Sequence, residues 1–462
     1  MFESDIYVQR RELLKKELQG GIVLFLGNGE SPMNYADNPY SFRQDSTFLY
    51  YFGLDTPGLA AIMDIDEDLE IFYGYDYTVD DIVWMGPQLS LQERAERVGI
   101  KKSAPEENLT NAVTSALNRG RLVHVLPPYR DEHRIKIASL LHLNIDTAEH
   151  YVSEPLIKAV VAQRSVKSAE EIGEIEKAID ITYEMHTFAM QHARPGMLER
   201  EISGKMAGIA AAYGSSISFP IIFSVHGETL HNHYHGNVMQ AGDLVVNDSG
   251  AESLLHYAGD ITRTIPIGGH FSKRQRDIYE IVLAAQKNAI NAIRPGIAYR
   301  DIHLQSARDM ADGLKQIGLM RGDIKEAVAV GAHALFFPHG LGHMLGLDVH
   351  DMENLGENVV GYDATIQRSS QFGLKSLRLA KALQPGYVLT VEPGLYFIPA
   401  LIEKWQSDKK FVEFINYDNL KDYMDFGGIR IEDDVLVTQN GSRVLGKPIP
   451  KTVDNVEALA SA

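Results

Sequence analysis

The sequence contains no cysteine among its 462 residues. A disulfide framework and a cysteine-ligated zinc site are therefore excluded, and any metal site must use histidine and carboxylate ligands. Positive charge is also scarce, since 44 lysine and arginine residues stand against 62 aspartate and glutamate residues, for a formal net charge of −18. This balance argues against a nucleic-acid partner, because such proteins need local positive charge to follow phosphates.

Long apolar runs are missing as well. No uninterrupted run is long enough to span a bilayer, and the charged N-terminal stretch 1–18 lacks the apolar centre of a signal peptide. We therefore expect a cytoplasmic protein without a membrane partner.

The length is sufficient for two domains. In the first third, short apolar runs at 21–26, 59–63, 69–72 and 121–126 read as strands, with helical stretches between them. This alternation predicts an α/β domain over residues 1–165.

The pattern changes near residue 165. Ser168-Ala169-Glu170-Glu171 is a capping box that opens a long amphipathic helix, and Arg194-Pro195-Gly196 ends it. We place the domain boundary just before this helix, so that the second domain covers residues 166–462.

The second domain contains a repeat. Arg194-Pro195-Gly196 returns as Arg294-Pro295-Gly296, and each copy is followed by a predicted helix. Two later turns, 239–242 and 383–386, each lead into a β-rich run that ends on a carboxylate, Asp248 in one and Glu392 in the other. Such turns are common individually, but their shared order favours a duplicated α/β unit that places Asp248 and Glu392 in related positions.

Four carboxylates lie in strand-like surroundings: Asp248, Asp260, Glu392 and Glu432. A carboxylate inside a strand is unfavourable unless it is paired or bound to metal, and an isolated one is as readily a surface acid. The segment 337–350 adds three histidines among glycines and apolar residues, at 339, 343 and 350. Oxygen-rich ligation with one imidazole suits manganese, cobalt, zinc or iron.

These motifs resemble the "pita-bread" metallopeptidases, the family of methionine aminopeptidases, aminopeptidase P and prolidase. The matching segments are Asn247–Gly250, Gly259–Thr262, His339–His343, Val391–Gly394 and Arg430–Asp433, and Phe42–Ser46 resembles the first domain of aminopeptidase P and prolidase. The resemblance implies an α/β N-terminal domain and an α+β pita-bread (creatinase/aminopeptidase) C-terminal domain with an internal pseudo-two-fold repeat. It also implies a homodimer or higher homo-oligomer.

The resemblance further implies two divalent metal ions per subunit that hold a hydroxide between them, with Mn²⁺ as the expected metal and Co²⁺, Zn²⁺ or Fe²⁺ as alternatives. Glu392 would also move a proton, His339 and His350 would stabilise the tetrahedral intermediate, and His231 would contact the substrate. Arg430, counted among the substrate-binding residues, would orient Glu432. The implied metal ligands are Asp248, Asp260, His343, Glu392 and Glu432.

One spacing departs from the family pattern. Asp260 follows Asp248 by twelve positions, one more than in related enzymes. We expect the extra residue to form a bulge or a longer loop within 251–256. A shift in strand register would instead turn Asp260 away from the metals.

Two features favour a dipeptidase, prolidase, which cleaves the Xaa-Pro bond of dipeptides. The segment 373–386 is similar to a prolidase segment in which an arginine, here Arg378, binds the free carboxylate of the substrate. The long stretch between Glu392 and Arg430 is also prolidase-like. On spacing alone, Lys375, Arg378 and Lys381 favour a solvated helix face instead.

Three alternatives remain. An Xaa-Pro aminopeptidase would release the first residue of longer peptides with proline at the second position. A metal-free pita-bread domain would only bind, although all five ligands are present. The histidines at 226, 231, 233 and 235 could also form a separate metal-binding tract, but compositional tracts are weak evidence.

Overall fold

The computed structural model describes residues 1–148 and 150–461. The chain divides into two compact units, Met1–Arg164 and Ser165–Ala462. Within the described residues, no helix has both the length and the apolar character needed to cross a membrane.

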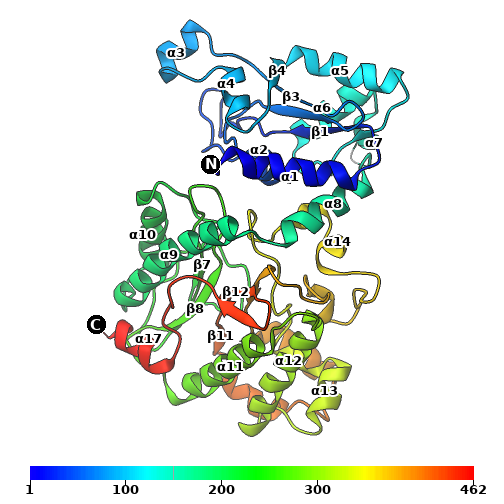
Figure 1. Cartoon of the computed structure of the whole chain (residues 1–462). Helices are drawn as coiled ribbons and strands as arrows, with labels where there is room; N and C mark the ends of the chain where they lie inside the picture. Colours follow the sequence, from blue (N-terminus) through cyan, green and yellow to red (C-terminus); the bar gives the residue numbers. More distant parts are fainter. Residues whose placement is uncertain (149, 462) are drawn as a thin grey trace. The chain divides into compact units, whose positions relative to one another are not determined.

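The first unit contains a mixed five-stranded sheet in the order β4-β3-β2-β1-β5. Its inner strand β1, which lies between β2 and β5, is apolar throughout because both of its faces are covered. The strands are β1 (Ile22–Leu26), β2 (Ala60–Asp64), β3 (Leu69–Gly74), β4 (Lys102–Pro105) and β5 (Val123–His124). The helices described in this part of the chain are α1 (Ser4–Glu17), α2 (Ser46–Phe52), α3 (Val79–Met85), α4 (Leu91–Glu96), α5 (Glu107–Asn118), α6 (Asp131–Leu141), α7 (Ile145–Ala148) and α8 (Glu154–Ser165). Helices α4, α5 and α6 pack against the sheet (Figure 1).

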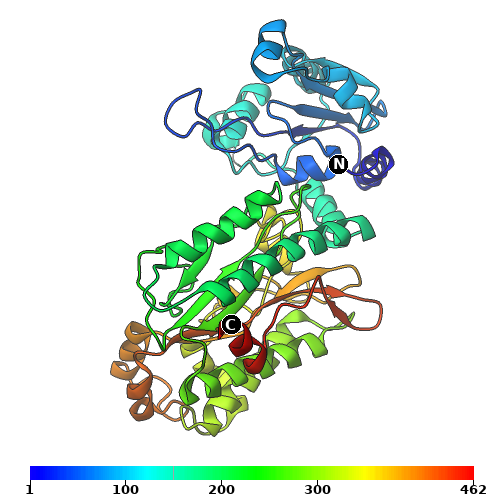
Figure 2. The same ribbon diagram turned by 90° about the vertical axis from the view of Figure 1, so that its left-hand side faces the viewer.

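The second unit begins with α9 (Ala169–His192), whose predicted capping box is formed by Ser168 and Glu171. Helices α9 and α10 (Glu199–Ala212) lie against the sheet β6-β7-β8, and α11 (Lys273–Ala292) and α12 (Tyr299–Gln316) cover the other half of the unit (Figures 1 and 2). The strands of the first half are β6 (Ile222–Ser224), β7 (Leu244–Ser249) and β8 (Ile261–Pro266).

The second half contains the sheet β13-β12-β9 and the pair β10-β11. Its strands are β9 (Val388–Val391), β10 (Gly394–Phe397), β11 (Gly427–Arg430), β12 (Asp433–Val437) and β13 (Ser442–Val444). The remaining helices are α13 (Ile324–Val330), η1 (Ala332–Leu335), η2 (Glu353–Leu355), α14 (Glu357–Gly361), η3 (Leu374–Ser376), α15 (Pro399–Ser407), α16 (Tyr417–Leu420), η4 (Lys421–Tyr423) and α17 (Val453–Ala460).

The backbone confirms the predicted repeat. The Gly196 N–H donates to the Met239 carbonyl, and the Gly296 N–H donates to the Leu383 carbonyl, so each Arg-Pro-Gly turn is tied to the segment before its strand. The bridges Leu198↔Val238 and Ala298↔Ala382 repeat the same connection. The two halves therefore present equivalent strand ends to the middle of the unit.

Candidate metal and peptide site

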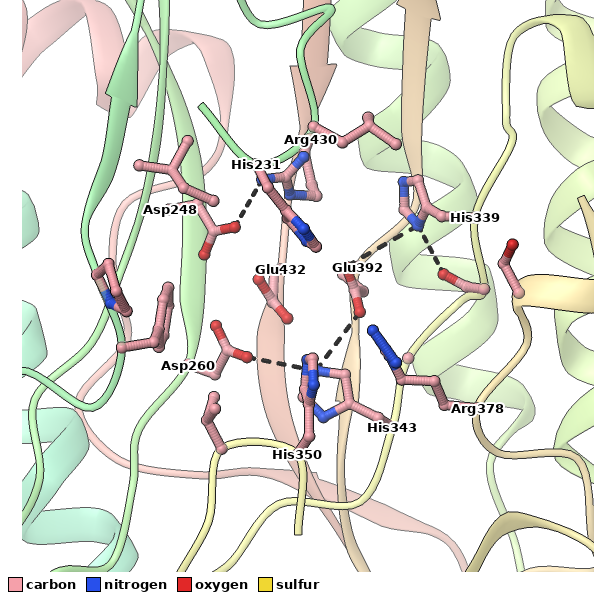
Figure 3. Close-up of a pocket in the computed structure, with 18 of the residues that line it drawn as sticks. His231, Asp248, Asp260, His339, His343, His350, Arg378, Glu392, Arg430 and Glu432 are labelled. Atoms are coloured by element: carbon pink, nitrogen blue, oxygen red, sulfur yellow. Dashed lines mark hydrogen bonds and ion pairs between the residues drawn. The ribbon is translucent and has the colours of Figure 1, made fainter. Parts of the chain in front are cut away.

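A pocket between the strand ends of the two halves has a cavity volume of about 420 Å³. That volume is within the range of small-ligand sites. Figure 3 shows the carboxylates of Asp260 and Glu392 directed toward the His343 ring and that of Asp248 directed toward Arg430. All of the predicted site residues line it: His231, Asp248, Asp260, His339, His343, His350, Arg378, Glu392, Arg430 and Glu432.

Asp248 and Asp260 come from one β-hairpin. The ladder of β7 and β8 pairs Asp248 with Thr262, and it continues without a bulge to the bridge Glu252↔Ala258. Opposite residues share a face, and so do residues two apart on a strand, so Asp260 lies on the same face as Asp248. The extra residue is accommodated in the turn, where His256 adopts φ +67°. The predicted longer loop is therefore present, and the register shift does not occur.

The glutamates come from the second half. Val391 pairs with Asp433 across β9 and β12, so Glu392 and Glu432 are the next residues along the same ladder. Glu432 is buried, and its Oε2 accepts a hydrogen bond of 2.6 Å from the Thr262 hydroxyl of β8. This contact joins the two halves at the site.

His343 lies between the two groups of carboxylates. Its Nδ1 is 3.0 Å from the Met344 carbonyl, which can only accept, so the proton is on Nδ1 and Nε2 is free as a ligand atom. Nε2 lies 3.4 Å from Asp260 Oδ2 and 3.6 Å from Glu392 Oε1. Ligand atoms of Asp260, His343 and Glu432 all lie within 4.8 Å of one another.

The electrostatics of the pocket fit divalent cations. Burial, with the neighbouring Asp248, raises the pKa of Asp260 well above its ordinary value, and burial with Asp260 does the same for Glu432. Burial raises the pKa of Glu392 to about 7. Asp248 Oδ1 is buried without a hydrogen-bond partner among the described residues. Cations bound here would partner that oxygen and offset the repulsion between the carboxylates.

Arg430 has a different contact from the predicted one. Its Nη2 donates to Asp248 Oδ2 at 2.6 Å, and it reaches Glu432 only through Thr262, whose hydroxyl accepts from Arg430 Nε at 3.1 Å. The arginine therefore orients Asp248 directly, because Asp248 and Arg430 lie on adjacent strand ends while Glu432 is two residues further along.

Tyr396 links Arg430 to His339. The Tyr396 hydroxyl accepts from Arg430 Nη1 at 2.8 Å and lies 2.8 Å from His339 Nε2. His339 Nδ1 lies 2.7 Å from the Gly340 carbonyl. Nδ1 therefore carries the proton, and Nε2 accepts from the tyrosine. Both ring nitrogens of His339 therefore contact neighbouring groups in this structure.

The remaining histidines and Arg378 also line the pocket. His231 is exposed at the pocket, and the partial desolvation of its ring, with the nearby Arg430, lowers its pKa. The His350 ring packs edge-on against the His343 ring, with centroids 4.3 Å apart. Arg378 follows the single-turn helix η3 and points into the pocket (Figure 3), so the alternative of a solvated helix face is wrong for this residue.

Three contributing residues were absent from the sequence-based prediction: Tyr396, Thr262 and Glu353. Thr262 lies two positions after Asp260 and Tyr396 lies four after Glu392, so the two-residue period of a strand could have indicated both. Glu353 had no such signal, because it contacts His350 and Arg378 through an irregular turn.

Comparisons with known proteins agree with this geometry. Residues 173–439 match the family described as "Metallopeptidase family M24", and residues 7–125 match "Aminopeptidase P, N-terminal domain". The chain is 31% identical to the Xaa-Pro aminopeptidase of Escherichia coli (strain K12), covering 99% of this chain and 97% of that protein. It is 30% identical to the Xaa-Pro dipeptidase of Homo sapiens, covering 97% and 90% respectively.

Solved structures of aminopeptidase P resemble this chain over its whole length. Proline aminopeptidase P II from Yersinia pestis superposes with a TM-score of 0.81 at 30% identity, covering 100% of both chains. Aminopeptidase P from E. coli with the inhibitor Pro-Leu gives 0.81 at 30% identity, covering 99% of this chain and 98% of that one. The predicted fold, an α/β domain followed by a pita-bread domain, is confirmed. The chain belongs to metallopeptidase family M24.

Proposed function

We propose that this protein is an Xaa-Pro dipeptidase that uses two divalent metal ions, held by Asp248, Asp260, His343, Glu392 and Glu432. The observation that carries the proposal is the convergence of these five side chains in one pocket that also contains Arg378. Similarity to an Xaa-Pro aminopeptidase and an Xaa-Pro dipeptidase supports the bond that is cleaved. Manganese is the metal we expect, with cobalt, zinc or iron as alternatives.

Two bound cations would supply Lewis-acid polarisation of the scissile carbonyl and a water nucleophile at neutral pH. The side chains of this protein then have separate tasks. Arg430 and Thr262 fix the carboxylates of Asp248 and Glu432. Glu392 receives a proton on a carboxylate oxygen and delivers it to the departing proline nitrogen.

Arg378 supports the choice of a dipeptide. Its Nη1 is bound by Glu353 and Glu357, while none of the described residues forms a recorded hydrogen bond with its Nε or Nη2. Those two donors form a planar fork that matches a carboxylate. A carboxylate bound at this place would follow the proline directly, and a longer peptide would lack it there.

A specific observation favours the second candidate, an Xaa-Pro aminopeptidase. The chain covers 97% of the E. coli aminopeptidase but 90% of the human dipeptidase. Both activities cleave the same bond and need the same ligands, so the difference between them depends on the Arg378 end of the pocket.

Hydrolysis of Gly-Pro beside Gly-Pro-Leu, with manganese added, separates the two candidates. A dipeptidase cleaves Gly-Pro with the higher kcat/KM, and Arg378→Gln reduces cleavage of Gly-Pro more than cleavage of the tripeptide. Faster cleavage of the tripeptide by the wild-type protein would establish the aminopeptidase instead. Absence of cleavage of both peptides, with or without metal, would reject the hydrolase.

A further inference from the structure

A short turn after His350 folds back onto the pocket. Met352 is buried and adopts the left-handed conformation at φ +62°, which is unfavourable for a side chain of this kind. The turn leads into η2, whose first residue, Glu353, donates its backbone N–H to the His350 carbonyl at 3.2 Å. The left-handed conformation of Met352 thereby brings the Glu353 side chain next to His350.

The Glu353 carboxylate contacts two site residues at once. Its Oε2 lies 2.7 Å from His350 Nδ1, and its Oε1 accepts from Arg378 Nη1 at 2.5 Å. Glu357 of α14 also accepts from Arg378 Nη1, at 3.1 Å. Glu353 therefore connects the histidine that packs on His343 with the arginine proposed to bind the substrate carboxylate.

The charge of the Glu353 carboxylate determines which of the two groups donates the hydrogen bond between Glu353 and His350. Burial opposes ionisation of Glu353, but hydrogen bonds from His350 and Glu357 lower its pKa to about 2, so it is ionised at neutral pH. An ionised carboxylate can only accept. His350 must then carry a proton on Nδ1, the ring atom that faces the carboxylate.

We propose that Glu353 is a positioning residue that holds His350 with its Nδ1–H engaged and at the same time holds Arg378 through Nη1. His350 then presents Nε2 to the peptide in one fixed orientation. The separation between His350 and the carboxylate-binding fork of Arg378 is fixed by one side chain. This inference rests on the proposed function, because it assigns His350 and Arg378 to the same peptide.

The first test is kinetic and uses Glu353→Gln. Its amide oxygen still accepts from Arg378, but its NH₂ group donates to His350 Nδ1 and moves the ring proton to Nε2. We expect kcat for Gly-Pro with manganese to fall about 10–100-fold, as for other residues that orient a catalytic ligand. Glu357→Gln contacts Arg378 and not His350, so its kcat should fall far less. Glu326→Gln, at an exposed position of α13, is the control for the substitution itself.

The second test observes the ring directly. Nitrogen-15 NMR of histidine-labelled, zinc-loaded protein distinguishes Nδ1–H from Nε2–H, and loss of signals in His350→Gln assigns them. We expect Nδ1–H in the wild-type protein and in Glu357→Gln, and Nε2–H in Glu353→Gln. A merely structural role for Glu353 would leave the tautomer unchanged.

The proposal is overturned if wild-type His350 lacks Nδ1–H, or if Glu353→Gln has the same kcat as Glu326→Gln. Its failure is distinct from failure of the proposed function. In the latter case the wild-type protein cleaves neither peptide, whereas the NMR measurement still decides the tautomer that Glu353 imposes.

Discussion

In the first half of the second unit, β7 and β8 pair Leu244 with Pro266, and in the second half β9 and β12 pair Val388 with Leu436. Counting along the ladders from these pairs makes Asp248 the counterpart of Glu392 and Thr262 the counterpart of Glu432. The same backbone therefore carries a carboxylate at both positions in one half and at one position in the other.

The difference shows how a duplicated backbone becomes an asymmetric site. Glu432 would bind metal, whereas Thr262 binds Glu432 through its hydroxyl. Arg430 and Asp260 are also counterparts by the same counting, and one is a cation while the other is a proposed ligand. The duplication supplies converging strand ends, and the side chains at matching positions divide the tasks of binding and orienting.

The largest effect is expected for Glu432→Thr, which places in the second half the residue type that its counterpart Thr262 has in the first half. We expect kcat/KM for Gly-Pro to fall by more than about 100-fold, because even residues that only orient a ligand contribute roughly 10–100-fold. Bound metal, measured by elemental analysis, should decrease in parallel. A variant that keeps both its metal and its activity would show that Glu432 is not a ligand.

Removal of the metals should make the stability of the protein depend on the protonation of Glu392, and therefore on pH. Burial raises the folded-state pKa of Glu392 to about 7 from the ordinary 4.5. As the pH falls through 7, the folded metal-free protein therefore takes up a proton that the unfolded chain does not, and it gains stability. The increase in Tm on adding manganese to chelator-treated protein should be larger at pH 8 than at pH 6. An equal increase at both values would contradict the proposed ligand role.

Thr262→Val tests the orienting role of the first half. The variant loses the bonds to Glu432 and Arg430 in a buried place, which should lower the free energy of unfolding by about 1–3 kcal/mol. Metal affinity should also fall, by roughly 10-fold. Thr264→Val is the matched control, because the Thr264 hydroxyl contacts only the Arg430 backbone. Equal metal affinities in the two variants would refute the orienting role, and titration calorimetry measures them.

The smallest expected effect concerns the helices behind the strands. His186 of α9 and Gln286 of α11 lie at the same distance before their Arg-Pro-Gly turns. Burial lowers the pKa of His186 to about 3 from 6.5, so the unfolded chain binds the extra proton and this residue reduces stability as the pH falls below 6.5.

His186→Gln removes that proton uptake. The wild-type protein should be the more stable of the two at pH 7.5, where His186 contacts Asn247 and Ser249. Its advantage should decrease by up to about 1.4 kcal/mol for each pH unit below 6.5. Urea unfolding at pH 7.5 and 5.5 measures the change, and a constant advantage would contradict it.

The sequence was sufficient to predict the fold and the convergence of the carboxylates, because the repeat, the motif order and the strand periods are local patterns. The sequence was insufficient to predict which groups the site residues bind through hydrogen bonds. Arg430 contacts Asp248 across two strands that lie far apart in the chain, and the two ring bonds of His339 depend on where Tyr396 is placed. Such contacts follow from packing, which no local pattern encodes.

The turn between β7 and β8 has a consequence for recognising related enzymes. A search that counts residues between the two aspartates would reject this chain, since the interval is one longer than usual. In this chain pairing, rather than distance along the sequence, brings the two aspartates together: Asp260 stands two residues before Thr262, the partner of Asp248. Added length in the turn leaves that relation intact, so hairpins of unequal length can encode the same pair of ligands.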